Sequence, residues 1–312
     1  MRTLFFGTPA LAVPYLDALH RQTQVQAVIT SPDQPVGRGY DVQSPAVKVA
    51  AERLQLPVVQ PERVKDAEFV NRMRDWNADL AVVVAYGKLL PPDVLAATRL
   101  GFINVHFSLL PAYRGAGPIQ WALINGEAET GVTLFWLDPG MDTGPIFLQK
   151  RLAIGPDEDA EALRQRLIPL GVHALEEGLQ MLVRGPKVAR PQTGAISHAP
   201  LLTKADGQLN WNQPAGVLHN RIRGLTPWPG AFCFVQQGNS KVRLKVLQSR
   251  VWPSGVPGRP GTVGAVERGK SFVVRCSEGS LEVLTVQPEG KKPMPAWSWW
   301  QGARLSVGDA LE

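Results

Sequence analysis

The feature that most constrains the fold is a regular alternation of short apolar runs and amphipathic stretches over the first 150 residues. Four runs have the length and composition of buried strands, at residues 3–6, 25–30, 80–85 and 102–106. Helical patterns bounded by proline or glycine lie between them, at residues 10–20, 46–54, 67–76 and 92–96. Strands and helices alternate in this way when crossover helices connect the strands of a parallel sheet. The pattern therefore predicts an open α/β domain.

The next segment extends this domain. Residues 132–137 and 146–152 are predicted as two further strands, and residues 159–183 as one long amphipathic helix that begins with acidic residues. Pro169 lies inside the helical pattern, and a proline there removes a helix hydrogen bond and clashes with the preceding turn. We therefore expect a kink or a break in this helix.

A change in composition marks the end of the α/β domain. From residue 185 to 207 the chain loses its periodicity and gains Gly, Pro, Ser and Thr, as is typical of a connection between domains. We predict a first domain over residues 1–189, a linker over 190–208 and a second domain over 209–312. Short β-type runs separated by turn residues predict a small β-barrel in the second domain, with strands at 244–247, 262–266, 272–276 and 281–286.

Charge divides the chain at the same place. Residues 209–312 hold 13 lysines and arginines against 6 acidic residues, whereas residues 1–208 hold 20 against 21. A basic surface raises the local concentration of polyphosphate and speeds association with it. The second domain is therefore predicted to bind nucleic acid, and a solubilising surface without a ligand is the alternative.

Composition argues against several classes of protein. No apolar run approaches the length of about 18 residues that spans a membrane, and the start of the chain is unlike a signal peptide, so we expect a soluble cytoplasmic protein. The two cysteines, Cys233 and Cys276, lack the spacing of a zinc site or a disulfide framework. We expect both to be buried apolar residues, and nothing in the sequence indicates an oligomer.

The densest group of reactive side chains follows the predicted strand at 102–106. Asn104 and His106 lie two residues apart, so they point to the same side of the strand, at the carboxyl end where α/β sheets bind ligands. An imidazole exchanges protons at cellular pH, and an amide N–H stabilises a developing oxyanion. The pair thus predicts proton transfer coupled to oxyanion stabilisation, against the alternative of a hydrogen-bonded strand-end histidine and a turn asparagine.

A downstream loop offers two carboxylates, Asp138 and Asp142, between the later strands. Either of them, if it lay against His106, would orient the ring and stabilise its protonated form. The alternative is an ordinary turn, because the Asp-Pro-Gly sequence at residues 138–140 is common in turns.

Taken together, these motifs resemble a known family of enzymes, the formyltransferases that use 10-formyltetrahydrofolate. The matching motifs are Asn104-x-His106 followed by Ser-Leu-Leu-Pro, Tyr113-Arg-Gly with Pro118-Ile-Gln-Trp121, Thr130-Gly-Val-Thr133, and Asp142-Thr-Gly. The resemblance implies that Asn104, His106 and Asp142 form a catalytic trio that requires no metal. It places the folate donor at Ser108, Leu109, Leu110 and Pro111, with Tyr86, Gly87 and Leu89 forming the pteridine pocket.

Further motifs resemble the members of this family that formylate the methionine carried by initiator methionyl-tRNA. They are Phe6-Gly-Thr-Pro9, residues 31–39, residues 222–230 and residues 287–292. This resemblance implies an open, mostly parallel Rossmann-like sheet domain followed by a C-terminal β-barrel of the oligonucleotide-binding (OB) type. It also implies tRNA as the partner, with contacts at Arg38, Lys204, Arg221, Lys291 and Lys292.

Two positions depart from the family pattern. Phe107 replaces a small residue and is expected to reshape the wall of the pocket, while Leu201 replaces a lysine and removes one expected phosphate contact. Two other functions stay open. A formyltransferase for sugar nucleotides or other small amines would share the trio but has no need of a basic domain. An RNA-binding protein with an inactive enzyme-like domain would not be expected to keep the trio.

Overall fold

A computed structural model describes residues 1–36, 41–185, 187–237 and 240–312 of the chain. The described residues form two compact units. The first unit contains Met1–Pro118, Thr130–Leu152 and Gln165–Pro200. The second contains Ile119–Glu129, Ala153–Arg164 and Leu201–Glu312. Residues 190–200, which we predicted as part of a linker, thus have their contacts in the first unit.

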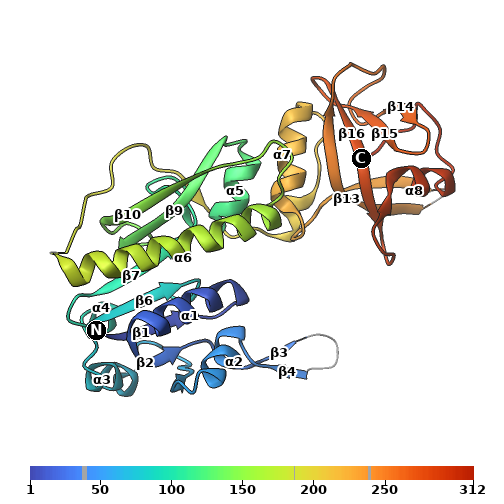
Figure 1. The fold of residues 1–312 in the computed structure, drawn as a ribbon. Coiled ribbons are helices and arrows are strands. Elements are labelled where there is room, and N and C mark those ends of the chain that lie inside the picture. Colours follow the sequence, from blue (N-terminus) through green and yellow to red (C-terminus); the bar gives the residue numbers. More distant parts are fainter. Residues whose placement is uncertain (37–40, 186, 238–239) are drawn as a thin grey trace. The chain divides into compact units, whose positions relative to one another are not determined.

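The first unit is built on a seven-stranded sheet with the order β10-β9-β7-β6-β1-β2-β5 (Figure 1). Its strands are β1 (Arg2–Gly7), β2 (Gln24–Ile29), β5 (Val58–Val59), β6 (Leu80–Val84), β7 (Phe102–His106), β9 (Glu129–Trp136) and β10 (Ile146–Ala153). The sheet is parallel from β5 through β2, β1 and β6 to β7. β9 then pairs with β7 in the antiparallel direction. The prediction of an open, mostly parallel α/β sheet is confirmed.

Apolar runs in the sequence explain why these strands lie at the centre of the unit. All five residues of β6, Leu-Ala-Val-Val-Val, are buried, as expected for a parallel strand that is covered on both faces. The helices that follow the strands are η1 (Ala10–Ala12), α1 (Val13–Gln22), α2 (Ala46–Arg53), α3 (Ala67–Asp75) and α4 (Pro92–Leu95). Two short pairings complete the unit: β3 (Gln34–Val36) with β4 (Asp41–Gln43), and β8 (Arg114–Gly115) with β11 (His198–Ala199).

The long helix α6 (Ala160–Arg184) continues through Pro169, so the break that the sequence suggested does not occur. Packing against α1 supports the helix at this point. The Tyr15 hydroxyl donates a hydrogen bond to the carbonyl of Ile168 at 3.1 Å. Gly171 permits this approach, because a Cβ atom there would collide with the Tyr15 hydroxyl. A tertiary contact therefore holds the helix where the proline alone would favour a break.

The second unit is built on an antiparallel sheet with the order β12-β13-β16-β15-β14, and β17 pairs with β16. Its strands are β12 (Ala231–Gln237), β13 (Ser240–Trp252), β14 (Val263–Glu267), β15 (Ser271–Arg275), β16 (Ser280–Pro288) and β17 (Met294–Pro295). Its helices are α5 (Pro118–Ile124), η2 (Lys204–Gly207), α7 (Ala215–Leu225) and α8 (Ala296–Gly302). The first residue of α5, Pro118, is assigned to the first unit.

The end of the chain joins the two edges of this second sheet. Leu311 bridges to Val235 on the β12 edge, and Ala310 bridges to Thr262 beside β14. Pairing at both edges covers backbone groups that would otherwise be exposed. The antiparallel β-domain is confirmed, and its assignment to the OB type stays a prediction. None of the helices within the described ranges is long and apolar enough to cross a membrane.

Candidate active site

The site is built at the carboxyl end of β7. His106 is the last residue of this strand and is 5% exposed, while Asn104 is half-buried. The strand lies between β6 and β9, where Asn104 is opposite Phe135 and His106 is opposite Thr133. Strand periodicity therefore holds both functional side chains on one face, as the sequence predicted. Among the described residues, none forms a hydrogen bond with the Asn104 amide, so this amide is available to a ligand.

The two ring nitrogens of His106 face different groups. Nε2 lies 2.8 Å from the carbonyl oxygen of Tyr113, and a carbonyl can only accept, so Nε2 carries a proton. Nδ1 lies 3.7 Å from Oδ2 of Asp142. The same carboxylate oxygen accepts a hydrogen bond from the Gly115 backbone N–H at 2.8 Å. A backbone carbonyl thus selects the tautomer of the ring, and the carboxylate is placed to stabilise a second proton, on Nδ1.

The structure distinguishes the two carboxylates of the downstream loop. Asp138 accepts hydrogen bonds from the Gly140 backbone N–H at 3.0 Å and from the Thr143 hydroxyl at 2.6 Å, so it stabilises its own turn. Asp142 lies beside His106 and adopts a left-handed backbone conformation with φ of 54°. The turn interpretation is therefore right for Asp138, whereas Asp142 reaches the histidine.

The Ser108–Pro111 segment is held from two neighbouring strands. Thr133 on β9 donates a hydrogen bond to the Ser108 carbonyl at 2.6 Å and accepts one from the Leu110 N–H at 3.1 Å. Gln149 on β10 donates to the Leu110 carbonyl at 2.9 Å and to the Thr133 hydroxyl at 3.0 Å. These bonds fix the backbone of a segment whose Leu109 side chain remains half-exposed.

The segment that contains Tyr86, Gly87 and Leu89 follows β6, so it lies at the same edge of the sheet as the segment after β7. The Tyr86 ring is buried against Phe6, with ring centroids 5.3 Å apart, whereas Gly87 and Leu89 are exposed. The Tyr86 hydroxyl is buried and has no hydrogen-bond partner within the described part of the chain. Burial raises the pKa of this phenol to about 12.

Backbone groups and a distant side chain also shape the site, and the sequence analysis did not identify them. The Tyr113 carbonyl and the Gly115 N–H, which contact His106 and Asp142, carry no side-chain signal in a sequence. Gly115 has a φ of 120°, and a Cβ atom there would lie 2.6 Å from the Ala199 carbonyl oxygen. Gln192 binds the loop of Asp142. Gln192 gave no comparable signal, because it ends the sequence Arg190-Pro-Gln within a segment that we interpreted only by its lack of periodicity.

The two departures from the family pattern lie in different surroundings. The Phe107 ring is 7% exposed and packs edge-on against Tyr15, with ring centroids 6.3 Å apart, so this side chain fills the protein core. Leu201 begins the last segment of the second unit and is 72% exposed. An exposed apolar residue at this position cannot make the phosphate contact of a lysine.

The predicted tRNA contacts lie at separate places in the second unit. Lys204 is exposed on η2, and Lys291 and Lys292 are exposed in the turn after β16. Arg221 is half-buried and donates two hydrogen bonds to the Asp206 carbonyl, at 2.6 and 3.1 Å, so it has a structural task in its own domain. Arg38 lies outside the described residues.

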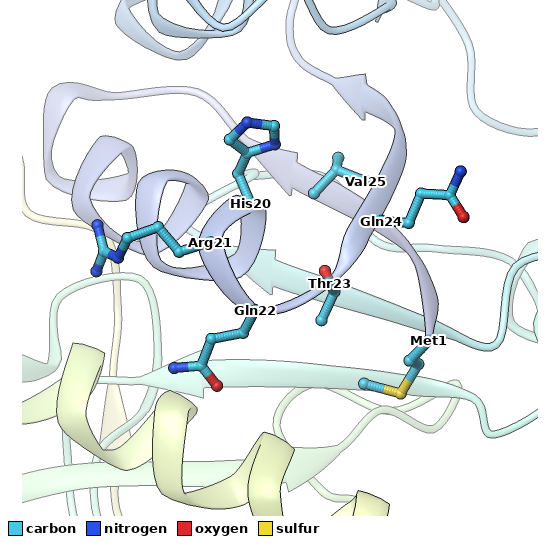
Figure 2. Close-up of a pocket in the computed structure, with 7 residues that line it drawn as sticks. All are labelled: Met1, His20, Arg21, Gln22, Thr23, Gln24 and Val25. Carbon is cyan, nitrogen blue, oxygen red and sulfur yellow. The ribbon is translucent and has the colours of Figure 1, made fainter.

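A shallow pocket at the amino ends of β1 and β2 is distinct from this site. The residues that line it are Met1 and the consecutive residues His20, Arg21, Gln22, Thr23, Gln24 and Val25 (Figure 2). Because β1, β2, β6 and β7 run in parallel, this pocket lies at the amino ends of the strands, whereas His106 lies at their carboxyl ends. Ligands of α/β sheets bind at the carboxyl edge, so His106 marks the candidate active site.

The fold and the site together define a class of enzyme. The site places an amide, an imidazole and a carboxylate together at the carboxyl edge of an α/β sheet, and groups of these types can stabilise an oxyanion and transfer a proton during transfer of an acyl-type group to a nucleophile. The chain belongs to the formyl transferase family. The family profile described as formyl transferase matches residues 1–179, and the profile of its C-terminal domain matches residues 201–304.

Curated relatives are similar over the whole chain. Eight of them, 41–45% identical over 98–100% of this chain, are named methionyl-tRNA formyltransferase. One from Thermodesulfovibrio yellowstonii is 42% identical over 306 residues, which is 98% of this chain and 97% of that protein. The predicted resemblance to this family, and within it to the methionyl-tRNA formyltransferases, is confirmed.

Solved structures share the fold at lower identity. An N-formyltransferase from Helicobacter canadensis, in complex with folinic acid and dTDP-3-aminofucose, has a TM-score of 0.65 and 18% identity, covering 92% of this chain and 98% of that one. HypX from Aquifex aeolicus, in complex with tetrahydrofolic acid, has a TM-score of 0.65 and 15% identity. That alignment covers 99% of this chain but 48% of HypX, so the chain spans about half of that structure.

Proposed function

We propose that this chain transfers the formyl group of 10-formyltetrahydrofolate to the α-amino group of the methionine on initiator methionyl-tRNA. The observation that carries the proposal is the identity of 41–45% with full-length relatives of that name. The donor is supported by two structures of the same fold that hold a folate, folinic acid in one and tetrahydrofolic acid in the other. The reaction belongs to translation initiation and places the enzyme in the cytoplasm.

Asn104 and His106 act on the reacting atoms in this proposal. The methionyl amine attacks the formyl carbon, a C–N bond forms, and the formyl oxygen becomes the oxyanion of a tetrahedral intermediate. The Asn104 amide has no partner among the described residues and donates its N–H to this oxyanion. His106 takes the proton of the attacking amine and returns it to the departing folate nitrogen, whose bond to the formyl carbon breaks.

The contacts of His106 assign its reactive nitrogen. Nε2 donates its proton to the Tyr113 carbonyl, so Nδ1 has the lone pair that accepts a proton. Asp142 lies 3.7 Å from Nδ1 and stabilises the imidazolium that results. In this proposal a backbone carbonyl fixes the tautomer of His106, and Asp142 stabilises its protonated form.

The folate donor occupies the edge of the sheet formed by the segments after β6 and β7. The Ser108–Pro111 backbone is fixed by Thr133 and Gln149, and Gly87 and Leu89 are exposed beside it along the same edge. A fixed backbone with half-exposed apolar side chains suits a flat heterocycle, because such ligands are held by apolar surface and a few placed polar groups.

The basic second unit favours tRNA over a small amine as acceptor. The fold is shared with an N-formyltransferase whose structure holds an amino-sugar nucleotide, so the fold alone does not separate the two substrates. An excess of seven positive charges over residues 209–312 has no use toward a single sugar nucleotide but attracts a polyphosphate chain. An RNA-binding protein without activity is disfavoured, because Asn104, His106 and Asp142 are all present and Asp142 lies 3.7 Å from His106.

A competition assay tests this proposal. The protein is given 10-formyltetrahydrofolate together with methionyl-tRNA, uncharged tRNA and a 3-amino-sugar nucleotide, and the formylated products are separated and counted. We expect formyl-methionyl-tRNA as the main product, with no product from uncharged tRNA. A preference for the amino sugar, or no transfer to any amine, would refute the proposal.

A further inference from the structure

We propose that Gln192, in the segment after α6, is a positioning residue that holds Asp142 against His106. The inference deepens the proposed function, since it concerns the same trio. No motif of the sequence analysis included this residue, and it lies 50 positions from Asp142 along the chain. Its side chain joins two loops through four hydrogen bonds.

The groups that face His106 come from two separate loops. Tyr113, whose carbonyl accepts from Nε2, precedes β8, and Asp142, whose carboxylate faces Nδ1, lies between β9 and β10. The His106 ring therefore keeps both the Tyr113 carbonyl and the Asp142 carboxylate beside it only while the two loops stay at a fixed separation. One direct link between them is the hydrogen bond from the Gly115 N–H to the Asp142 carboxylate.

Gln192 provides a second link that does not use the carboxylate. Its amide nitrogen donates to the carbonyls of Asp142 and Gly144, both at 2.8 Å. Its amide oxygen accepts from Nε and Nη2 of Arg114, at 3.2 and 2.7 Å. An amide has two N–H donors and one oxygen with two lone pairs, so this side chain uses its full hydrogen-bonding capacity to join the loops.

Both loops need such support. Tyr113 and Asp142 have φ values of 61° and 54°, in the left-handed region that side chains other than glycine disfavour. A non-glycine residue keeps this conformation only when surrounding contacts enforce it. The two N–H groups of Gln192 hold the backbone carbonyls of Asp142 and Gly144, the residues on either side of Thr143, which fixes the direction of the Asp142 side chain.

The rest of the Gln192 segment is itself anchored to the first unit. Arg190 exchanges two backbone hydrogen bonds with Ile146, at 2.7 and 2.8 Å. Ser197 accepts a hydrogen bond from the Tyr113 N–H at 2.9 Å through its hydroxyl, and β11 pairs with β8 directly after it. The chain is thus anchored both before and after Gln192, so the position of its side-chain amide relative to the Asp142 loop is fixed.

A positioning role of this kind affects the chemical step more than substrate binding. Gln192 contacts neither the segment after β6 nor Ser108–Pro111 in the hydrogen bonds of the described residues, so folate and tRNA should bind as before. Displacement of a catalytic group by about 1 Å costs on the order of 10²-fold in rate. Gln192→Met, which keeps the length of the side chain, should therefore lower kcat by about 10²-fold with KM values within about threefold.

Two further variants separate positioning from general damage. Gln192→Glu keeps the acceptor for Arg114 but loses both donors to the Asp142 loop, so it should be as slow as Gln192→Met. Gln26→Met is the matched control and should keep wild-type rates, because within the described residues the Gln26 side chain makes only a local 3.3 Å hydrogen bond on β2. Wild-type activity in Gln192→Glu would overturn the proposal, since the link through the loop would then be dispensable.

A double-mutant cycle tests whether Gln192 acts through Asp142. In the Asp142→Asn background, Gln192→Met should slow single-turnover transfer by less than about threefold, because the carboxylate that it positions is already lost. A full 10²-fold loss in that background would show an independent role and would overturn the proposal. Far-UV circular dichroism of each variant separates a slow enzyme from an unfolded one.

The state of His106 provides a readout that does not depend on the acceptor. Imidazole ¹⁵N NMR spectra of the histidine-labelled protein report which ring nitrogen carries the proton. We expect the His106 signals of Gln192→Met to differ from wild type, and those of Gln26→Met to match it. If the wild type formylates another amine instead of methionyl-tRNA, the proposed function fails and the same comparison is made on that amine. Unchanged His106 signals together with unchanged kcat overturn the role of Gln192.

Discussion

Replacement of Thr133 by valine is a sharp test of how the folate segment is held. The two side chains have nearly the same shape, so Thr133→Val removes a hydroxyl without opening a cavity. In the native protein this buried hydroxyl donates to the Ser108 carbonyl at 2.6 Å and accepts from the Leu110 N–H at 3.1 Å. It also accepts from Gln149, whose amide keeps a second partner in the Leu110 carbonyl.

The structure sets the size of the effect. Valine leaves two buried backbone groups, the Ser108 carbonyl and the Leu110 N–H, without their partner. A buried group that loses its partner costs about 1–3 kcal/mol, so the loss for two groups should lower the free energy of unfolding by about 2–6 kcal/mol. Since the same bonds fix the segment proposed to bind the folate donor, KM for the donor should rise more than KM for tRNA.

Urea denaturation and steady-state kinetics measure the two effects, with Thr133→Ser as the control. Serine keeps the hydroxyl and loses one methyl group, which costs about 1 kcal/mol. The order of stability should be wild type, then serine, then valine. A valine variant at least as stable as the serine variant would refute the reasoning, because the hydroxyl would then contribute less than a methyl group.

Three other predictions concern the basic unit, a buried phenol and the thiols. Reversing the charge of Lys291 and Lys292 together should weaken tRNA binding and flatten its salt dependence, whereas Lys65→Glu in the first unit should not; titrations at several salt concentrations measure both. Tyr86→Phe removes a buried hydroxyl without a partner in the described ranges, so the free energy of unfolding should stay within about 1 kcal/mol of wild type or increase, as chemical denaturation would report. Both cysteines are buried, and burial raises the pKa of Cys233 to about 12, so a thiol reagent at pH 8 should label the unfolded protein but not the native one.

The parts of the fold that could be predicted from sequence are those with strong local patterns. The strand predicted at 102–106 has the same bounds as β7, and the run at 80–85 differs from β6 only at its last residue. All five residues of β6 are buried and apolar, so its run is continuous and ends sharply, whereas the apolar residues of β7 flank the half-buried Asn104. Pro169 shows the limit of local rules, because the Tyr15 contact that supports α6 comes from a residue far away along the chain.

The candidate site follows the same division. Asn104, His106 and Asp142 were predicted because their side chains have recognisable chemistry and motif spacing. The Tyr113 carbonyl and the Gly115 N–H could not be predicted in this way, because every residue has these groups and only the loop conformation aims them. Arg221, for which the resemblance implies a tRNA contact, donates two hydrogen bonds to the Asp206 carbonyl, which no sequence motif indicated. Its contact with tRNA stays a prediction.

Single-turnover formyl transfer by His106→Ala measures whether the imidazole at the end of β7 moves the proton of the attacking amine. Removal of a general acid–base group lowers the rate by about 10²–10⁴-fold, and circular dichroism should show an intact fold. With 10-formyltetrahydrofolate and methionyl-tRNA at saturation, we predict a loss within that range. A folded His106→Ala enzyme that transfers formyl within about tenfold of the wild-type rate would contradict the account.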